Sequence, residues 1–323
     1  MISADEVQLA YRLFLGREPE NEDVVNDLCQ SVHTVDELRA EFYKSAEFRK
    51  YMEEILDASP KVAQRHPFHL PNIPVDVDCS DDVLDMMFSR IAGEWSNLGK
   101  VDPYWSVITQ PQYHLDQFDG HREQFFNSGS HISNLFLASL RRCRINPNLL
   151  ESCLDFGCGV ARVSAQLANI FPRVIGVDIS KPHLELAKSF CESGNIKNVE
   201  LIHLERIRMV QSLPQVDLIL SVITLQHNPP PVIYWLIKNL LGLLKSGGVA
   251  FIQVPTYRNG YLFEIENYLN TSAPNTLEMH FLPQIDVFRA INESGCACLE
   301  VREDGMVGHE NLMLSNSFVI QKN

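Results

Sequence analysis

Residues 154–162 read Leu154-Asp155-Phe156-Gly157-Cys158-Gly159-Val160-Ala161-Arg162 and place an acid just before two closely spaced glycines. Gly157 and Gly159 allow a ligand to approach the backbone where a Cβ atom would collide with it, and a helix that follows would offer unpaired N–H groups. A dinucleotide-binding fingerprint needs a third glycine three residues after the second, but that position is Arg162. Asp155 could instead hold an ammonium group, so the turn favours a cofactor that carries an amino acid over NAD.

Segments on both sides of this turn alternate between predicted strands and helices. We expect strands at residues 153–156, 174–177, 199–204, 217–224 and 249–254, and helices at residues 160–170, 182–191 and 232–244. Strands that alternate with helices form parallel sheets whose two faces are covered by those helices. The predicted fold is therefore α/β, with a Rossmann-like sheet between two layers of helices.

Two further acids follow at the ends of predicted strands. Asp178 ends the second strand, 19 residues after Gly159 (178 − 159), where a carboxylate can accept hydrogen bonds from both hydroxyls of a ribose. Glu205 follows the third strand and could accept from an adenine amino group. Either acid alone is more often a solvated side chain. Together with Asp155 and the glycines, on three successive strands, the two acids indicate a ligand that contains a nucleoside.

This order of acids and glycines resembles the class I S-adenosylmethionine-dependent methyltransferases, over about residues 125–323. The family motif acid-x-Gly-x-Gly-x-Gly is met from Asp155 to Ala161, with Ala161 at the third glycine. Residues 176–180 resemble the ribose motif, residues 225–227 the end of the fourth strand, and residues 244–248 the turn before the fifth. Glu205 stands where the family more often has aspartate.

The resemblance implies a seven-stranded sheet whose last strand, residues 318–321, is antiparallel. It also implies S-adenosylmethionine as the cofactor and methyl transfer as the reaction. The residues that we expect to contact the cofactor are Asp155, Gly157, Gly159, Arg162, Asp178, Ile179, Glu205, Ser221 and Gln226.

The sulfonium methyl group is already electrophilic, so the protein must chiefly place a nucleophile in line with it and exclude water. A base would help a hydroxyl acceptor, and His227, at the end of the fourth strand, is the first candidate. The alternative is that His227 only binds backbone in the turn at residues 228–230. His280, in the segment at residues 255–283, is a second candidate, and His131 is expected near a helix N-cap.

Aromatic side chains are concentrated at residues 83–130, which suits either a lid with a substrate wall or ordinary packing of a helical subdomain. Phe125 and Phe126 would cover the adenosine or only pack. We expect the methyl acceptor to be a hydroxyl or amine of a sugar, a glycan or a small metabolite. The expected substrate-binding residues are Trp95, Tyr104, Trp105 and Tyr257.

The first part of the chain, residues 1–56, is expected to be a helical domain. Capping boxes are predicted at Ser3 to Glu6 and Thr34 to Glu37. The words Tyr11-Arg12-x-x-Leu15-Gly16-Arg17-x-Pro19 and Ser45-Ala46-Glu47-Phe48 resemble a bacterial helical domain of unknown function, seen in surface-associated and glycan-modifying proteins. The charged residues Arg12, Arg17 and Glu47 could form ion pairs within the domain or a binding site.

Four prolines between residues 57 and 82 indicate a linker after this helical domain. The expected divisions are thus a helical domain at residues 1–56, a linker at 57–82, a lid and substrate wall at 83–130, and a methyltransferase domain at 131–323.

Composition excludes several other classes. The chain has 323 residues and a net charge of −14 (27 − 41), without a run of five basic residues, so neither nucleic acid nor a membrane surface is an expected partner. It shows neither a membrane-spanning run nor a signal peptide, and we expect a cytoplasmic protein. The eight cysteines lack metal-ligand spacing, so neither disulfides nor a metal site is expected, and Cys296 and Cys298 fit one face of a strand.

Two competing functions stay open at this stage. The chain could be a catalytically silent, cofactor-binding scaffold whose N-terminal helices bind a partner, or a nucleotide-dependent oxidoreductase on a related sheet. Arg162 disfavours the oxidoreductase, and the complete series of acids disfavours the silent scaffold. A homo-oligomer is compatible with either function.

Overall fold

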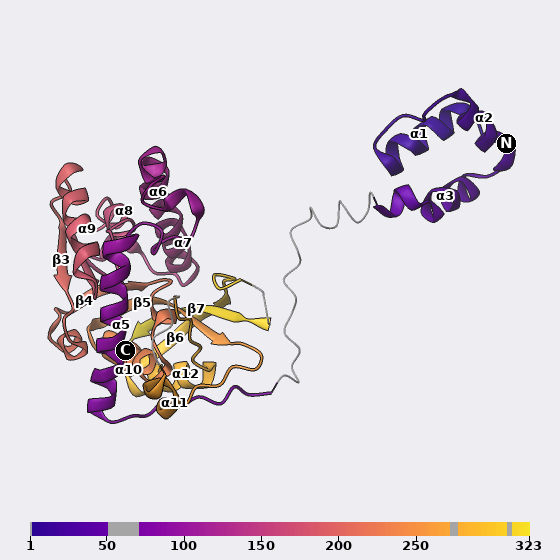
Figure 1. Ribbon diagram of the computed structural model, residues 1–323. Coiled ribbons are helices and arrows are strands. Elements are labelled where there is room, and N and C mark those ends of the chain that lie inside the picture. The colour runs from indigo at the N-terminus through magenta and orange to yellow at the C-terminus, as the bar shows by residue number, and fades with distance from the viewer. Residues whose placement is uncertain (1, 51–70, 272–276, 309–311) are drawn as a thin grey trace. The chain divides into compact units, whose positions relative to one another are not determined.

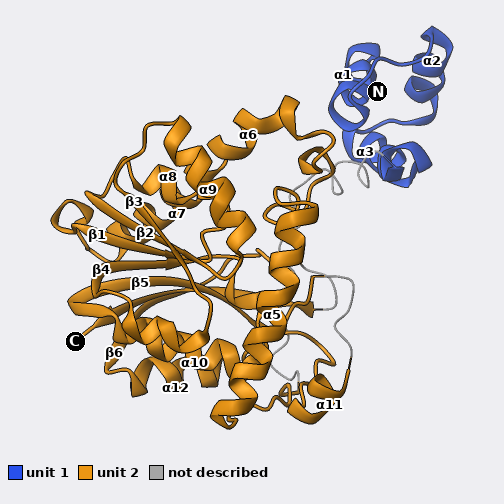
Figure 2. Cartoon of the chain, turned by 60° about the vertical axis from the view of Figure 1, so that its left-hand side comes forward, with its two compact units in different colours: residues 1–65 blue, residues 66–323 orange. Residues whose placement is uncertain are grey.

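The computed structural model describes residues 2–50, 71–271, 277–308 and 312–323. The chain divides into two compact units, residues 1–65 and residues 66–323 (Figure 2). The expected linker lies partly outside the described residues, at 57–70. Its described part, from residue 71 onward, belongs to the second unit.

The first unit contains α1 (Ala4–Leu15), α2 (Glu22–Ser31) and α3 (Val35–Lys44), and residues 46–50 are also helical. Both predicted capping boxes are present, at the starts of α1 and α3. Each box satisfies helix N–H groups that would otherwise have no partner. Tyr11 and Phe42 pack edge to face at the centre of the unit, with ring centroids 5.0 Å apart.

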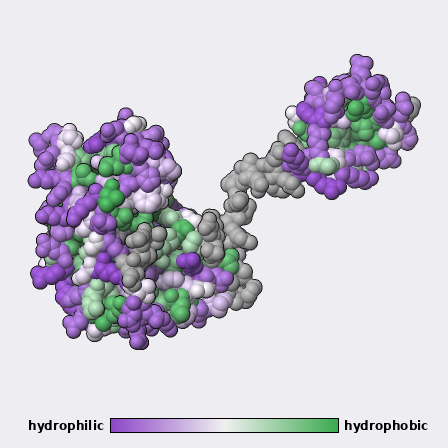
Figure 3. Space-filling view, in the orientation of Figure 1, coloured by the Kyte–Doolittle hydropathy of each residue, from purple (hydrophilic) through white to green (hydrophobic). Residues whose placement is uncertain are grey.

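Charged side chains of the first unit pair with one another. Arg17 donates to both carboxylate oxygens of Glu47, at 2.6 and 2.7 Å, and also to Glu20 at 2.6 Å. Arg12 donates to Glu18 at 2.6 Å. The structure therefore shows the intradomain ion pairs, and ion pairs at such exposed positions contribute little to stability because water screens them. Figure 3 also shows an apolar patch among the polar side chains of this unit.

The second unit is built on one seven-stranded sheet, as expected from the resemblance (Figure 1). The strand order is β3-β2-β1-β4-β5-β7-β6, with the first five strands parallel and β7 antiparallel to both β5 and β6. The strands are β1 (Ser152–Phe156), β2 (Arg173–Asp178), β3 (Val199–His203), β4 (Val216–Ser221), β5 (Leu244–Tyr257), β6 (Cys296–Glu303) and β7 (Leu314–Lys322).

Helices cover both faces of the sheet, as Figure 2 shows. One face carries α7 (Gly129–Arg142), α8 (Ser164–Leu167) and α9 (Lys181–Ser193), and the other carries α10 (Pro230–Gly242) and α12 (Gln284–Glu293). Successive strand residues point to opposite faces. Cys153 therefore joins the core beneath α7, whereas Leu154 joins the core beneath α10.

Three predictions differ from the structure by more than a small shift of the bounds. The helix expected at residues 160–170 is reduced to α8, because Gly159 and Ala161 adopt positive φ values of 52° and 63° that a right-handed helix cannot contain. The strand expected at residues 217–224 ends at Ser221, since Ile223 has a φ of 56°. The turn expected at residues 244–248 lies within β5.

Helix α5 (Asp81–Val101) joins the core of the sheet. Met87, Phe88 and Ile91 are fully buried in the same cluster as Leu154 and residues of α10. Immediately before α5, Val75 forms a bridge with Phe263. Residues 82 and 130, where we expected divisions, both lie in the second compact unit, in which α5 is buried against the sheet.

Short helices complete the second unit. They are η1 (Pro111–Tyr113), η2 (Phe118–His121), α6 (Arg122–Asn127), η3 (Pro147–Leu149), η4 (Ile207–Ser212), η5 (Leu225–His227) and α11 (Ile265–Asn270). Across the described parts of the chain, no helix has both the length and the apolar character that a membrane crossing requires.

Candidate functional site

A pocket lies where β1, β2 and β4 end, with α5 as one of its walls. Of the fifteen residues predicted for the site, eight line this pocket: Trp95, Asp155, Gly157, Gly159, Arg162, Asp178, Ile179 and His227. Carboxyl ends of parallel strands meet at one edge of a sheet, which is where open α/β folds bind ligands. The pocket is therefore the candidate active site.

The turn after β1 follows from its glycines. Gly157 has a φ of 81°, and a Cβ atom there would stand 2.2 Å from the side chain of Thr224, so only glycine fits between β1 and the loop after β4. Ala161, at the third glycine position of the motif, also takes a left-handed conformation. The structure thus assigns to Gly157 a packing role that the sequence did not reveal.

Asp178 ties the end of β2 to this turn. One carboxylate oxygen accepts from the Gly159 N–H at 2.7 Å, and the other accepts from the Ser180 N–H at 2.8 Å. Each carboxylate oxygen can accept a second hydrogen bond. The side chain therefore holds the glycine turn in shape while keeping acceptor capacity toward the pocket.

Asp155 is buried beside the pocket. Ser164 Oγ donates to its carboxylate at 2.6 Å. Burial raises the pKa of Asp155 to about 6, against the opposing effects of the Ser164 hydrogen bond and the Arg162 charge. A cation bound next to this group would therefore stabilise its ionised form.

Arg162 lines the pocket as well. Its Nη1 is 3.1 Å from Ser128 Oγ, whereas its buried Nε has no hydrogen-bond partner among the described residues. Burial lowers the pKa of this guanidinium. A buried N–H without a partner is costly, and an anionic ligand group would satisfy it. Asp155 and Arg162 together complement the ammonium and carboxylate of an amino acid.

His227 also lines the pocket, from η5. Its Nδ1 is 2.8 Å from the backbone oxygen of Glu278, and its ring packs edge-on against Trp95 with the centroids 5.1 Å apart. Burial lowers the pKa of His227 to about 4, so the imidazole is neutral at physiological pH.

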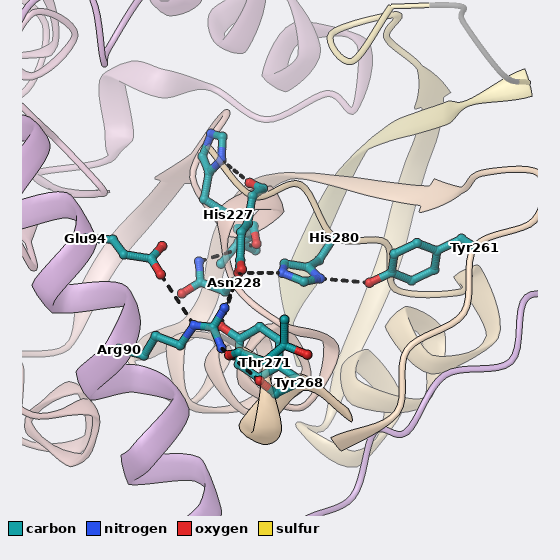
Figure 4. Close-up of polar contacts among 10 residues, drawn as sticks. Arg90, Glu94, His227, Asn228, Tyr261, Tyr268, Thr271 and His280 are labelled. Carbon is teal, nitrogen blue, oxygen red and sulfur yellow. Dashed lines mark hydrogen bonds and ion pairs between the residues drawn. The ribbon is translucent and has the colours of Figure 1, made fainter. Parts of the chain in front are cut away.

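His280, the second candidate base, does not line this pocket. Its Nδ1 is 2.9 Å from the Tyr261 hydroxyl and its Nε2 is 3.1 Å from the Glu278 carboxylate (Figure 4). Both ring nitrogens therefore already have partners. The cluster around His280 also includes Arg90 of α5, whose Nη2 donates to Glu278 at 2.8 Å.

Six other predicted residues also lie outside the pocket lining. Tyr104 stacks on Phe118 and Trp105 on His114. The Glu205 side chain is 70% exposed beside His203, and the Ser221 and Gln226 side chains are buried in protein. Tyr257 ends β5. Phe125 and Phe126 belong to the aromatic cluster of Tyr104 and Phe118.

His183 was not predicted from the sequence. This residue of α9 is 1% exposed and lines the pocket, where its Nδ1 is 2.7 Å from Ser180 Oγ and its Nε2 is 2.9 Å from Ser106 Oγ. Ser180 Oγ also donates to the Trp95 carbonyl of α5. The spacing of Ser180 and His183 at a helix start could have suggested a local contact, but not the partner at Ser106.

Comparisons with known proteins agree with this geometry. Residues 153–248 match a family described as methyltransferase domain. A ubiquinone biosynthesis O-methyltransferase of Coxiella burnetii is 32% identical over 51% of this chain and 58% of its own length. A second, from Acinetobacter baylyi, is 28% identical over 45% of this chain and 63% of its own length. The chain thus matches less than two thirds of these curated relatives.

A solved structure of similar fold is magnesium protoporphyrin IX methyltransferase from Synechocystis PCC 6803 with bound SAH. It has a TM-score of 0.50 and 16% sequence identity, and the alignment covers 72% of this chain and 98% of that one. At this identity the likeness concerns the fold. The strand order and the glycine turn are consistent with the match of residues 153–248 to the methyltransferase domain family.

Proposed function

We propose that the chain transfers a methyl group from S-adenosylmethionine to a hydroxyl or amine of a small metabolite, sugar or glycan, by in-line displacement. The observation that carries this proposal is the pocket itself. It combines a buried acid, an unsatisfied guanidinium N–H and a second acid around one glycine turn. These groups complement an amino acid joined to a ribose.

The residues divide into a cofactor side and an acceptor side. Asp155 and Arg162 would hold the amino-acid part of the cofactor, and Asp178 the ribose. When bound, S-adenosylmethionine supplies an electrophilic methyl group. Phe88 and Trp95 of α5 contribute apolar wall to the pocket, which helps to exclude water.

His227 would receive the acceptor. Its ring lines the pocket together with uncharged side chains such as Trp95, Ile223 and Asn228. The described residues with formal charge in the pocket, Asp155, Arg162 and Asp178, lie around the glycine turn instead. An uncharged acceptor group is therefore favoured near His227. The names of the curated relatives, O-methyltransferases, support oxygen as the acceptor atom.

A sugar or glycan acceptor rests on a weaker argument. It derives from the surface-associated and glycan-modifying proteins that contain the domain similar to residues 8–50. This is an association between domains and does not identify a binding site. The pocket wall beside His227 supports a small metabolite at least equally well.

A silent scaffold is the alternative function, and one observation favours it. Leu9 and Leu13, one turn apart on α1, are 52% and 70% exposed. Apolar side chains spaced four residues apart form one helix face, which a partner could cover.

Two measurements test the proposal. S-adenosylhomocysteine should raise the melting temperature by the mass-action term RT ln(1 + [L]/Kd), whereas NAD should not. A screen of candidate metabolites and glycans should then detect a methyl mass gain. Stabilisation by NAD alone would exclude methyl transfer, and cofactor binding without any product across a broad screen would favour the scaffold.

A further inference from the structure

Glu278 connects the candidate active site to a polar cluster that also contains Arg90, Tyr268 and His280. Its backbone oxygen is 2.8 Å from His227 Nδ1, and its carboxylate is 2.8 Å from Arg90 Nη2. Figure 4 shows Arg90 and Glu94 on α5, facing the segment that carries His280. Arg90 and Glu278 are thus in direct contact although they are 188 positions apart in sequence.

The contact with Glu278 determines which nitrogen of His227 carries the proton. A backbone carbonyl has only lone pairs, so Nδ1 must donate to it. A neutral imidazole has a single N–H, which leaves a lone pair on Nε2. The side-chain amide nitrogen of Gln226 is 3.3 Å from that Nε2, where it can act as a donor. Because Nε2 has a single lone pair, it can accept from an incoming hydroxyl only in place of the Gln226 amide.

Arg90 contacts the chain on both sides of residues 272–276, which lie outside the described part of the chain. Besides Glu278, its guanidinium donates to the backbone oxygens of Tyr268 and Thr271, at 2.8 and 2.9 Å, and lies 4.1 Å from the centre of the Tyr268 ring. The Arg90 and Glu278 side chains are only 17% and 13% exposed. An ion pair so shielded from water is stronger than one at the surface.

The other contacts of Glu278 act on the same segment. His280 Nε2 and the Tyr268 hydroxyl are 3.1 and 3.2 Å from its second carboxylate oxygen. The backbone N–H of His280 donates to the Gln226 carbonyl at 2.8 Å, next to His227 itself. The segment around Glu278 is thus fixed both to α5 and to the turn that carries His227.

We propose that the Arg90–Glu278 ion pair positions His227, because it holds the Glu278 carbonyl against Nδ1 and so fixes the Nδ1–H tautomer. Arg90 and Glu278 are positioning residues, since they act through His227. The effect on rate rests on the proposed function, whereas the effect on the tautomer does not.

The test is a long-range ¹H–¹⁵N spectrum of the full chain labelled with ¹⁵N-histidine, at pH 7. The His227 signals are those absent from the spectrum of His227→Gln. We expect the Nδ1–H tautomer in the unmodified protein and a shift toward Nε2–H in Arg90→Gln. Arg90→Lys, which keeps the charge, should retain more of the original tautomer. Arg208→Ala is the matched control, because it removes ion pairs to Asp81 and Asp85 of α5 without touching Glu278.

Each result of this experiment decides the proposal. An Nε2–H tautomer in the unmodified protein, or an unchanged His227 spectrum in folded Arg90→Gln, overturns it. If Arg90→Gln does not fold, the near-isosteric Glu278→Gln replaces it with the same expected shift, and an unchanged spectrum there has the same meaning.

The rate provides the second readout. Once an acceptor is identified, Arg90→Gln should lower kcat by about tenfold or more. The decrease should not exceed the roughly 10²- to 10⁴-fold expected for removal of the base itself, and cofactor affinity should be unchanged. Absence of methyl transfer in the unmodified protein would refute the proposed function, and the tautomer result would still decide the positioning role.

Discussion

Asp178 accepts a hydrogen bond from the backbone N–H of Gly159 at 2.7 Å, so the acid that ends β2 also holds the glycine turn that follows β1. β1 and β2 are neighbours in the sheet, with Phe156 opposite Val177. Two motifs separated by nineteen residues (178 − 159) are therefore parts of one structural unit.

Replacement of Asp178 by alanine should weaken cofactor binding while the chain stays folded. The loss should be on the order of 2 to 4 kcal/mol, since each hydrogen bond to a charged group contributes about 1.5 to 3 kcal/mol and the contributions are not additive. Calorimetric titration with S-adenosylhomocysteine measures it. Asp178→Asn keeps one acceptor oxygen, so its affinity for the cofactor should lie between those of the unmodified protein and Asp178→Ala. An unchanged dissociation constant for Asp178→Ala would mean that the ribose is held elsewhere.

Cofactor binding should depend on pH through Asp155. Burial raises the pKa of this group to about 6 in the folded protein. The protonated carboxyl therefore stabilises the folded chain at low pH, and this stabilisation is lost as the pH rises through 6. A bound ammonium group favours the ionised form. Affinity for the cofactor should therefore fall as the pH drops from about 7 to about 5. Binding at about pH 5.5 should release a proton from Asp155.

Calorimetry in buffers of different ionisation enthalpy measures this proton release. Asp155→Asn should abolish it and remove most of the pH dependence. Because the pKa of His227 is about 4, work at pH 5 or above, roughly one unit higher, separates the two groups. Proton release that persists in Asp155→Asn would assign the titration to another residue.

Replacement of His227 by alanine should lower kcat by about 10²- to 10⁴-fold with an oxygen acceptor and leave cofactor affinity nearly intact. The base must be deprotonated, and its pKa of about 4 places the acidic limb of the rate profile near pH 4. His131→Ala, at an exposed histidine of α7, is the control. If His227→Ala loses cofactor binding or unfolds, the residue is structural, and full activity would show that positioning alone supplies the rate.

A shortened chain that begins at residue 66 should fold and bind cofactor, whereas one that begins at residue 82 should be less stable. The second truncation removes the mutual hydrogen bonds of residues 74–76 with Phe263, at 3.0 and 3.1 Å, and the Ser80 cap of α5. Two backbone hydrogen bonds and one cap contribute on the order of 2 to 4 kcal/mol. Urea denaturation compares the two chains. Equal midpoints would mean that residues 66–81 do not stabilise the second unit, whose boundary would then lie at residue 82.

The sheet could be predicted because its evidence is local. Alternating apolar segments and the acid-glycine turn specify parallel strands, and the resemblance supplies the antiparallel β7. Helix α8 could not be predicted, because an alanine in a left-handed conformation at residue 161 is imposed by its surroundings. The packing of α5 was missed for a similar reason, since the partners of Phe88 and Ile91 lie far away in sequence.

The candidate site shows the same division. The residues at the glycine turn and at Asp178 were found by spacing within one βαβ unit, and they line the pocket. His183 and the Arg90–Glu278 pair depend on contacts between segments 77 and 188 positions apart. Side chains such as Tyr104 and Trp105 were expected at the pocket by residue type alone, and each stacks on a neighbouring ring instead.

Under the proposed function, the position of α5 bears on how the choice of acceptor can change. This helix contributes Phe88 and Trp95 to the pocket, yet it lies outside residues 153–248, which match the methyltransferase family. Substitutions on it can reshape the acceptor wall while the glycine turn and its acids stay intact. Directed evolution for a new acceptor would thus do best to randomise the inner face of α5, in the way that antibody diversity is concentrated in a few segments on a constant framework.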